Sequence, residues 1–460
     1  MPPAALRALR HRNYRLFFSG QIVSLVGTWM QSVAQAWLIY RLTDSPFLLG
    51  LVGFANNFPV FFIAPFGGAL ADRMSRRRIL LATQTASMSL AALLAAFTLT
   101  GIIRPGHILL FASILGIING FDIPARQAFA AELVGREDLA NAIALNSTVF
   151  NAARVAGPAI AGLVVAAIGE GWCFAVNAAS YVAVLSSLLL MRMTPQVRRE
   201  SEESTLKVLT SGFTFAGTTG PVRVLLLLLV VLSFTGMPYT VLMPIFASEI
   251  LGGGARTLGV LMGATGVGAL LGSIALATHG SVRGLGRWVA RAALGFGVFL
   301  VVFAYSRDVR LSVALLIPVG FSMVVSMASS NTLIQAMVPD EIRGRVMAVY
   351  SMVFMGGAPL GALLAGSLAE TIGAPATVAA GGALSIVAAL VFSVRLPAHR
   401  VVARELILAQ QMAGGEPAQE ATALPAHVSS LGVSESGSRS GSPESRSPAS
   451  SHDSPTPTDP

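Results

Sequence analysis

Residues 68–78 read Gly-Ala-Leu-Ala-Asp-Arg-Met-Ser-Arg-Arg-Arg and join two apolar runs at about 47–71 and 79–100. Each run is long enough for a helix to cross a hydrocarbon core roughly 30 Å thick. Short clusters of arginine between such runs are typical of the cytoplasmic loops of membrane proteins. This stretch therefore predicts two membrane-spanning helices joined by a basic loop.

The rest of the chain has the same alternation of apolar runs and short charged breaks. Hydrophobic residues make up 54% of the 460 residues and charged residues only 12%, whereas a soluble domain carries about 25% charged residues. So few charges cannot cover a water-facing surface, which excludes a soluble globular enzyme. We expect an all-α integral membrane protein whose main surroundings are the lipid bilayer.

The apolar runs predict twelve transmembrane helices. Their approximate ranges are 16–40, 47–71, 79–100, 107–131, 140–167, 172–191, 223–247, 257–278, 287–305, 311–336, 346–369 and 375–394. Most of the 31 Lys and Arg residues flank these spans on one side, which predicts that both termini are cytoplasmic. We expect a multi-pass protein of a bacterial-type cytoplasmic (inner) membrane. The net charge of +9 then reflects topology and indicates no nucleic-acid partner.

Weak internal symmetry relates the two halves of the chain. Residues 131–138, before the fifth span, resemble residues 337–345, before the eleventh, and Gly157-Pro158 has a counterpart in Ala358-Pro359. Such symmetry is typical of transporters built from repeats. It predicts two pseudo-symmetric six-helix bundles.

The bundle boundaries follow from the charged and polar interruptions. The longest charged break before the C-terminal segment runs from Arg192 to Lys207. We therefore expect an N-terminal bundle, a cytoplasmic central linker, a C-terminal bundle and a cytoplasmic tail. Their ranges are 1–191, 192–222, 223–395 and 396–460. The tail is rich in Ser, Pro and Gly from about residue 414 and is predicted to be disordered from there.

The loop at 68–78 resembles the signature of the major facilitator superfamily, Gly-x-Leu-x-Asp-Arg-x-Gly-Arg-Arg, with Ser75 in place of the second glycine. The resemblance extends over residues 10–396. Within it, residues 40–46, the Pro-Ala-Arg at 124–126 and Gly157-Pro158 are similar to the branch that contains the enterobactin-type siderophore exporters. The resemblance implies a secondary active transporter that works by alternating access and without a cofactor.

A second signature of the superfamily supports export. Gly157, Pro158 and Gly162 are similar to the Gly-Pro pattern in the fifth helix of its antiporters. The resemblance implies a proton-coupled antiporter, an efflux protein for a siderophore or a drug-like compound.

The loop resemblance also implies a conformational latch. Gly68 is expected to let the second span approach a neighbouring helix, and Asp72 to face an arginine or a helix N-terminus, where charge and dipole attract. Such a contact would hold one transport state and break on switching. The alternative is a basic clamp that only sets topology. The latch comprises Gly68, Asp72, Arg73, Arg76, Arg77 and Arg78.

A few ionisable residues lie inside the predicted spans, where burial is costly and function is the usual reason. Asp122 and Arg126 are four residues apart and share a helix face, so Asp122 is the proton-coupling candidate and Arg126 its partner. The alternative is a purely structural pair. Arg154 lies near the midplane and is expected to face a central cavity and attract an anionic substrate, or else to cap backbone carbonyls.

Neutral polar residues complete the candidate cavity. Gln31 and Gln35 in the first span and Asn331 in the tenth are expected to line it. The alternative is that they form interhelical hydrogen bonds, typically worth about 0.6 kcal/mol in membranes.

Other chemistries lack their residues. The single lysine, Lys207, has none of the neighbours of a phosphate-binding loop, the six histidines do not pair at metal-ligand spacing, and Cys173 is the only cysteine. We expect no enzyme activity, no metal and no cofactor.

The sequence therefore predicts a proton-coupled exporter of a small amphipathic or anionic compound. Its partners are that substrate and protons, and the sequence indicates no oligomeric state. Two alternatives stay open: an importer of the same fold, and a membrane sensor or scaffold that transports nothing.

Overall fold

The computed structural model describes residues 4–193, 205–279, 282 and 284–412. Across these residues every regular element is a helix. The α-helices are α1 (Arg12–Thr43), α2 (Pro46–Arg73), α3 (Arg76–Leu99), α4 (Pro105–Ile168), α5 (Glu170–Leu190), α6 (Thr205–Thr218), α7 (Gly220–Val231), α8 (Met243–Ile245), α9 (Ala255–His279), α10 (Leu285–Ala304), α11 (Val309–Met337), α12 (Asp340–Ile372) and α13 (Ala374–Met412). In this part of the chain, 12 helical segments are long and apolar enough to cross a membrane, which confirms the predicted fold class.

The longest helix, α4, contains two of these spans. They are Pro105–Gly135 and Glu137–Ile168, and they meet at Gly135, whose φ of 71° lies in the left-handed region. Glycine adopts this conformation without steric cost. The helix is therefore broken at Gly135, between the two spans.

The seventh span, Gly220–Ile250, is irregular in its second part. After α7 it passes through a π turn η2 (Leu232–Gly236), a 3-10 turn η3 (Met237–Thr240), α8 and a second π turn η4 (Phe246–Ile250). Prolines in η3 and α8 remove backbone donors and interrupt the helical ladder. Irregular backbone at membrane depth is tolerated where protein buries it, and most residues of these turns are buried.

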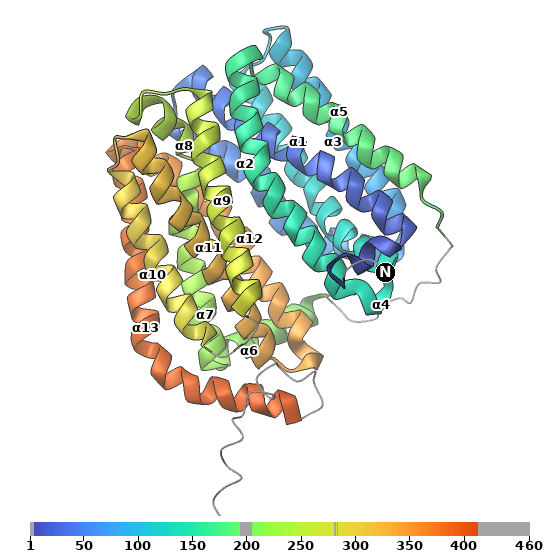
Figure 1. The fold of residues 1–460 in the computed structure, drawn as a ribbon, viewed down its shortest axis with the longest axis vertical. Coiled ribbons are helices and arrows are strands. Elements are labelled where there is room, and N and C mark those ends of the chain that lie inside the picture. Colours follow the sequence, from blue (N-terminus) through green and yellow to red (C-terminus); the bar gives the residue numbers. More distant parts are fainter. Residues whose placement is uncertain (1–3, 194–204, 280–281, 283, 413–460) are drawn as a thin grey trace, which may run out of the picture. The chain divides into compact units, whose positions relative to one another are not determined.

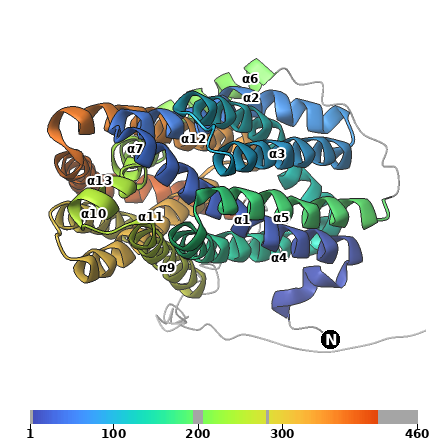
Figure 2. The same ribbon diagram turned by 90° about the horizontal axis from the view of Figure 1, so that it is seen from above.

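The first and second halves of the chain each pack mainly against themselves (Figures 1 and 2). In the first half α1 contacts α4 and α5, and in the second half α11 contacts α9 and α10. Two large helix contacts join the halves, α2 with α12 and α4 with α9, and α1 makes smaller contacts with α8 and α9. These are the contacts that a two-bundle transporter needs between its bundles.

Glycines make the contacts between the halves close. A Cβ on Gly50 of α2 would lie 2.5 Å from the Ala362 oxygen of α12, and a Cβ on Gly259 of α9 would lie 2.6 Å from the Pro158 oxygen of α4. Small residues allow this approach of helix backbones. Both contacts lie toward the helix ends remote from the basic loop at 68–78, so the halves meet at that end.

A short N-terminal helix, η1 (Ala4–Arg10), docks on the start of the fifth span. Asp138 is 1% exposed. It accepts a hydrogen bond from Arg7 at 2.8 Å, forms an ion pair with Arg10 at 2.8 Å and lies 2.7 Å from His11 Nε2. This cluster, Arg7, Arg10, His11 and Asp138, ties the N-terminal arm to α4.

Two predicted boundaries differ from the structure. The last span was expected to end near residue 394, but α13 continues to Met412, and Ile407 is buried against the hydrophobic core. The charged residues after 394 end the lipid-facing stretch but not the helix, because a helix can continue beyond the bilayer. The linker at 192–222 likewise contains α6, and the predicted disorder from residue 414 lies outside the described residues.

Candidate functional site

Asp122 lies in the first span of α4 and is 3% exposed. Its Oδ1 accepts from the Thr83 hydroxyl at 2.7 Å and from Gln84 Nε2 at 2.8 Å, both in α3. Its Oδ2 lies 3.3 Å from Arg126 Nη2. The two residues that the sequence placed on one helix face are thus an ion pair, and three donors surround the carboxylate.

Arg126 connects this pair to a third helix. Its Nη1 donates to Gln21 Oε1 of α1 at 3.3 Å, and its side chain is 29% exposed. The cluster of Asp122, Arg126, Thr83, Gln84 and Gln21 therefore joins α1, α3 and α4. We call it the Asp122 cluster.

The sequence analysis missed the three neutral members of the Asp122 cluster. A buried carboxylate needs donors, and that need is the signal that could have pointed to polar residues of neighbouring spans.

Arg154 lies in the second span of α4. Its guanidinium carbon is 5.9 Å from the centre of the Trp29 ring, within the range of a cation–π contact. Within the described part of the chain no carboxylate pairs with it. Its backbone oxygen would lie 2.8 Å from a Cβ on Gly266 of α9, so the backbone of Arg154 lies where the two halves touch.

Tyr239, in the irregular seventh span, faces this region from the second half. It is within electrostatic range of Arg154, and its buried hydroxyl makes no hydrogen bond of normal geometry with the described residues. Sequence reasoning did not find this residue, because a tyrosine in an apolar span is an ordinary core residue.

The other cavity candidates have partners within or between helices. Gln31 accepts from Asn177 Nδ2 of α5 at 2.7 Å, which is the interhelical bond given above as the alternative. Gln35 is 3% exposed and its Nε2 has no partner among the described atoms. Asn331 accepts from Gln335 one turn along α11.

The latch residues make their polar contacts within the first half. Asp72 is 59% exposed on its side chain and lies 3.8 Å from Arg76 Nη2, whose Nη1 is 3.2 Å from Glu132 Oε2. Arg77 donates to the Leu188 oxygen at 2.8 Å. The side chains of Arg73 and Arg78 are exposed.

The packing role predicted for Gly68 is wrong. A Cβ there would have no atom within 4 Å, whereas a Cβ on Gly67 would lie 2.3 Å from the Gly120 oxygen of α4. Adjacent helical residues point about 100° apart, so only one of the two faces α4. The structure assigns the close approach to Gly67.

The antiporter-like residues of the fifth span lie between the two halves. A Cβ on Gly157 would be 2.4 Å from the Trp29 Cβ of α1, and a Cβ on Gly162 would be 2.9 Å from the Ala255 oxygen of α9. Pro158 supplies the oxygen that Gly259 approaches. The motif thus packs α4 closely against one helix from each half.

Two hydroxyl–carboxylate bonds also link the halves at their contacting ends. The Tyr40 hydroxyl of α1 donates to Glu249 of η4, and Ser45 Oγ donates to Glu370 Oε1 of α12 at 2.8 Å. No local pattern predicts these pairs, because their members are 209 and 325 residues apart.

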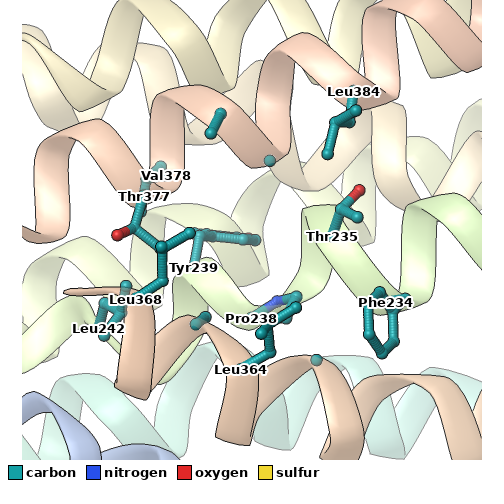
Figure 3. Close-up of a pocket in the computed structure, with 14 residues that line it drawn as sticks. Phe234, Thr235, Pro238, Tyr239, Leu242, Leu364, Leu368, Thr377, Val378 and Leu384 are labelled. Carbon is teal, nitrogen blue, oxygen red and sulfur yellow. The ribbon is translucent and has the colours of Figure 1, made fainter. Parts of the chain in front are cut away.

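A pocket of about 440 Å³, counting space open to its surroundings, lies in the second half (Figure 3). Its walls come from the irregular seventh span, α12 and α13 and are mostly apolar. None of the described residues that line it is charged, and the hydroxyls of Thr235 and Thr377 donate to backbone carbonyls four residues earlier in the chain. It therefore offers no charge to an anionic ligand. In the described residues no three His, Cys, Asp or Glu side chains gather as a metal site requires.

The sequence model of the family described as "Transmembrane secretion effector" matches residues 3–417. The chain belongs to this family of the major facilitator superfamily. It is therefore a multi-pass membrane transporter, and the resemblance carried by the loop at 68–78 is confirmed.

Its relatives include a siderophore transporter, a multidrug efflux pump and a siderophore exporter. The staphyloferrin A transporter of Staphylococcus aureus (strain NCTC 8325 / PS 47) is 25% identical over 82% of this chain and 95% of that protein. The multidrug efflux pump Tap of Mycolicibacterium fortuitum is 27% identical over 76% and 88%. The enterobactin exporter EntS of Shigella boydii serotype 4 (strain Sb227) is 28% identical over 81% and 89%.

The fold is also that of solved superfamily structures. The nucleoside transporter NupG superposes with a TM-score of 0.67 over 84% of this chain and 99% of its own, at 14% identity. This likeness concerns the fold alone.

Proposed function

We propose that this transporter exports a small amphipathic or anionic compound, of the siderophore or drug-like kind, in exchange for protons across a bacterial-type cytoplasmic membrane. The relatives named as an exporter and as an efflux pump support the outward direction. The bundles 1–191 and 223–395 would move against each other, with both termini in the cytoplasm.

The observation that carries proton coupling is the Asp122 cluster. Asp122 is an almost fully buried carboxylate, and its ionic partner is a single arginine on the same helix. Whether such a carboxylate binds a proton depends on how closely its cationic and hydrogen-bonding partners hold it. A movement of α3 against α4 would change the distances from Asp122 to Thr83 and Gln84, which would link protonation to conformation.

Alternating access is supported by where the two halves touch. Their close glycine contacts lie at one end, and the latch loop at the other end has an exposed Asp72 whose ionic partner, Arg76, belongs to the first half. In the opposite state the glycine contacts would open. Asp72 would then meet the second half.

Arg154 supports an anionic substrate. Its guanidinium lies over the Trp29 ring and has no carboxylate partner in the described residues. Holding such a charge unpaired in a membrane protein is costly, and an anionic substrate would neutralise it.

The test uses purified protein in proteoliposomes with enterobactin and staphyloferrin A as probes. A proton gradient that is acidic inside should drive uptake of at least one probe into vesicles that carry the protein inside-out. Asp122→Asn should lower this gradient-driven uptake at least tenfold. Asp308→Asn is the matched control, because Asp308 caps α11 and asparagine caps equally well.

Three outcomes would contradict the proposal. Equal uptake of the probe with and without the proton gradient would refute proton coupling. Uptake that runs in the same direction as the protons makes the protein an importer. Equal gradient-driven uptake by the Asp122→Asn and Asp308→Asn variants would refute the role of Asp122.

A further inference from the structure

Of the three donors around Asp122, one can also accept a hydrogen bond. The Arg126 guanidinium has no acceptor, and Gln84 contacts the carboxylate through its amide nitrogen, which only donates. The Thr83 hydroxyl can do both. Among these contacts Thr83 alone suits both a carboxylate and a protonated acid.

Thr83 lies within reach of two acceptors. Its Oγ1 is 2.7 Å from Asp122 Oδ1 and 3.2 Å from the Leu80 oxygen, one turn earlier in α3. A hydroxyl has a single hydrogen, so it donates to one of these oxygens at a time. Rotation about the Cβ–Oγ bond moves the hydrogen from one to the other without moving a heavy atom.

We propose that Thr83 is a positioning residue that hydrogen-bonds Asp122 in both of its protonation states. While Asp122 is a carboxylate, the Thr83 hydroxyl donates to Oδ1. When a proton binds Oδ1, the new O–H donates to Thr83 Oγ1, whose own hydrogen turns to the Leu80 oxygen. Gln84 still donates to Oδ1 and Arg126 to Oδ2, so one proton is added and no other contact breaks. This inference rests on the proton-coupling role proposed for Asp122.

Burial makes a built-in partner necessary. Asp122 and Thr83 are 3% and 8% exposed, so bulk water does not replace a missing partner. The charged or titratable groups that face Asp122 among the described residues are Arg126 of α4 and Tyr181 of α5, the latter within electrostatic range. The helix α3 contributes only the neutral Thr83 and Gln84, and α1 reaches the cluster through Gln21.

The test needs no substrate. Infrared difference spectra of the full-length protein in proteoliposomes, recorded between acidic and alkaline buffer, contain the carbonyl band of each acid that titrates. The band missing in Asp122→Asn belongs to Asp122. In Thr83→Val this band should move to higher wavenumber, because the acid loses its acceptor. Thr83→Ser keeps the hydroxyl and should give the wild-type band.

Two further variants keep the test decisive. Thr83→Ala also lacks the hydroxyl and should show the same displacement if Thr83→Val does not fold. Thr85→Val is the matched control, because Thr85 is exposed on the same helix, and it should leave the band unchanged.

The outcomes separate the two proposals. If no band disappears in Asp122→Asn, then Asp122 does not change protonation, and both proposals fall. If the Asp122 band is present but stays in place in Thr83→Val and Thr83→Ala, or moves equally in Thr85→Val, the role of Thr83 is refuted and proton coupling by Asp122 stands.

Discussion

Gly259→Ala measures how closely the two halves must approach. The new Cβ would lie 2.6 Å from the Pro158 oxygen and 2.8 Å from the Gly162 Cα. Both are backbone atoms and cannot rotate away, so α9 and α4 must separate. Overpacking of this kind costs about 1–3 kcal/mol. At about 1.4 kcal/mol per factor of ten, the ratio of the closed to the open arrangement should fall by roughly 5- to 150-fold.

The change can be read as a distance between spin labels. Leu42→Cys in α1 and Ile372→Cys in α12 place labels on exposed positions of opposite halves, near the ends that touch. The native Cys173 is buried and should not react. Double electron–electron resonance in proteoliposomes measures the distance between the two labels. In Gly259→Ala a larger fraction of molecules should show the longer distance.

Gly106→Ala is the matched control, because a Cβ at Gly106 has no atom within 4 Å. It should give the wild-type distance distribution. If Gly259→Ala also leaves the distribution unchanged while the protein stays folded, the glycine contact does not set the balance between the two arrangements.

Two further variants test other parts of the site. Gly67→Val should lower the midpoint of thermal unfolding, because its Cβ meets the Gly120 oxygen at 2.3 Å, whereas Gly68→Val has open space and should match wild type; equal effects would refute the packing assignment. Arg154→Gln should weaken transport of anionic enterobactin at least tenfold and that of cationic ethidium less than twofold, measured in the same vesicles, and equal losses would indicate a structural role.

The fold was predictable because lipid imposes a simple rule on the sequence. Each of the twelve predicted spans overlaps a helix, since a run of about 20 apolar residues can satisfy its backbone in lipid only as a helix. The end of α13 was not predictable from that rule. Ile407 is buried against other parts of the protein. The hydropathy of residues 395–412 does not show whether this segment packs on the protein or lies in water.

The candidate site was predictable only where its residues are neighbours on one helix. The spacing of Asp122 and Arg126 determines that they meet. Thr83 is 39 residues from its partner, and nothing local in α3 marks the hydroxyl that faces Asp122. Gly67 was missed for a related reason, because the family signature contains the neighbouring Gly68 and does not define which helix face packs.

The docked N-terminal arm has a consequence for how the protein is made. Arg7 leaves the ribosome 131 residues before its partner Asp138, and His11 leaves 127 residues before it. During translation these side chains therefore lack their carboxylate partner while the first four spans are made. Asp138 is made only when the fifth span begins. The N-terminal helix η1 can therefore dock on α4 only after the first four spans have been made.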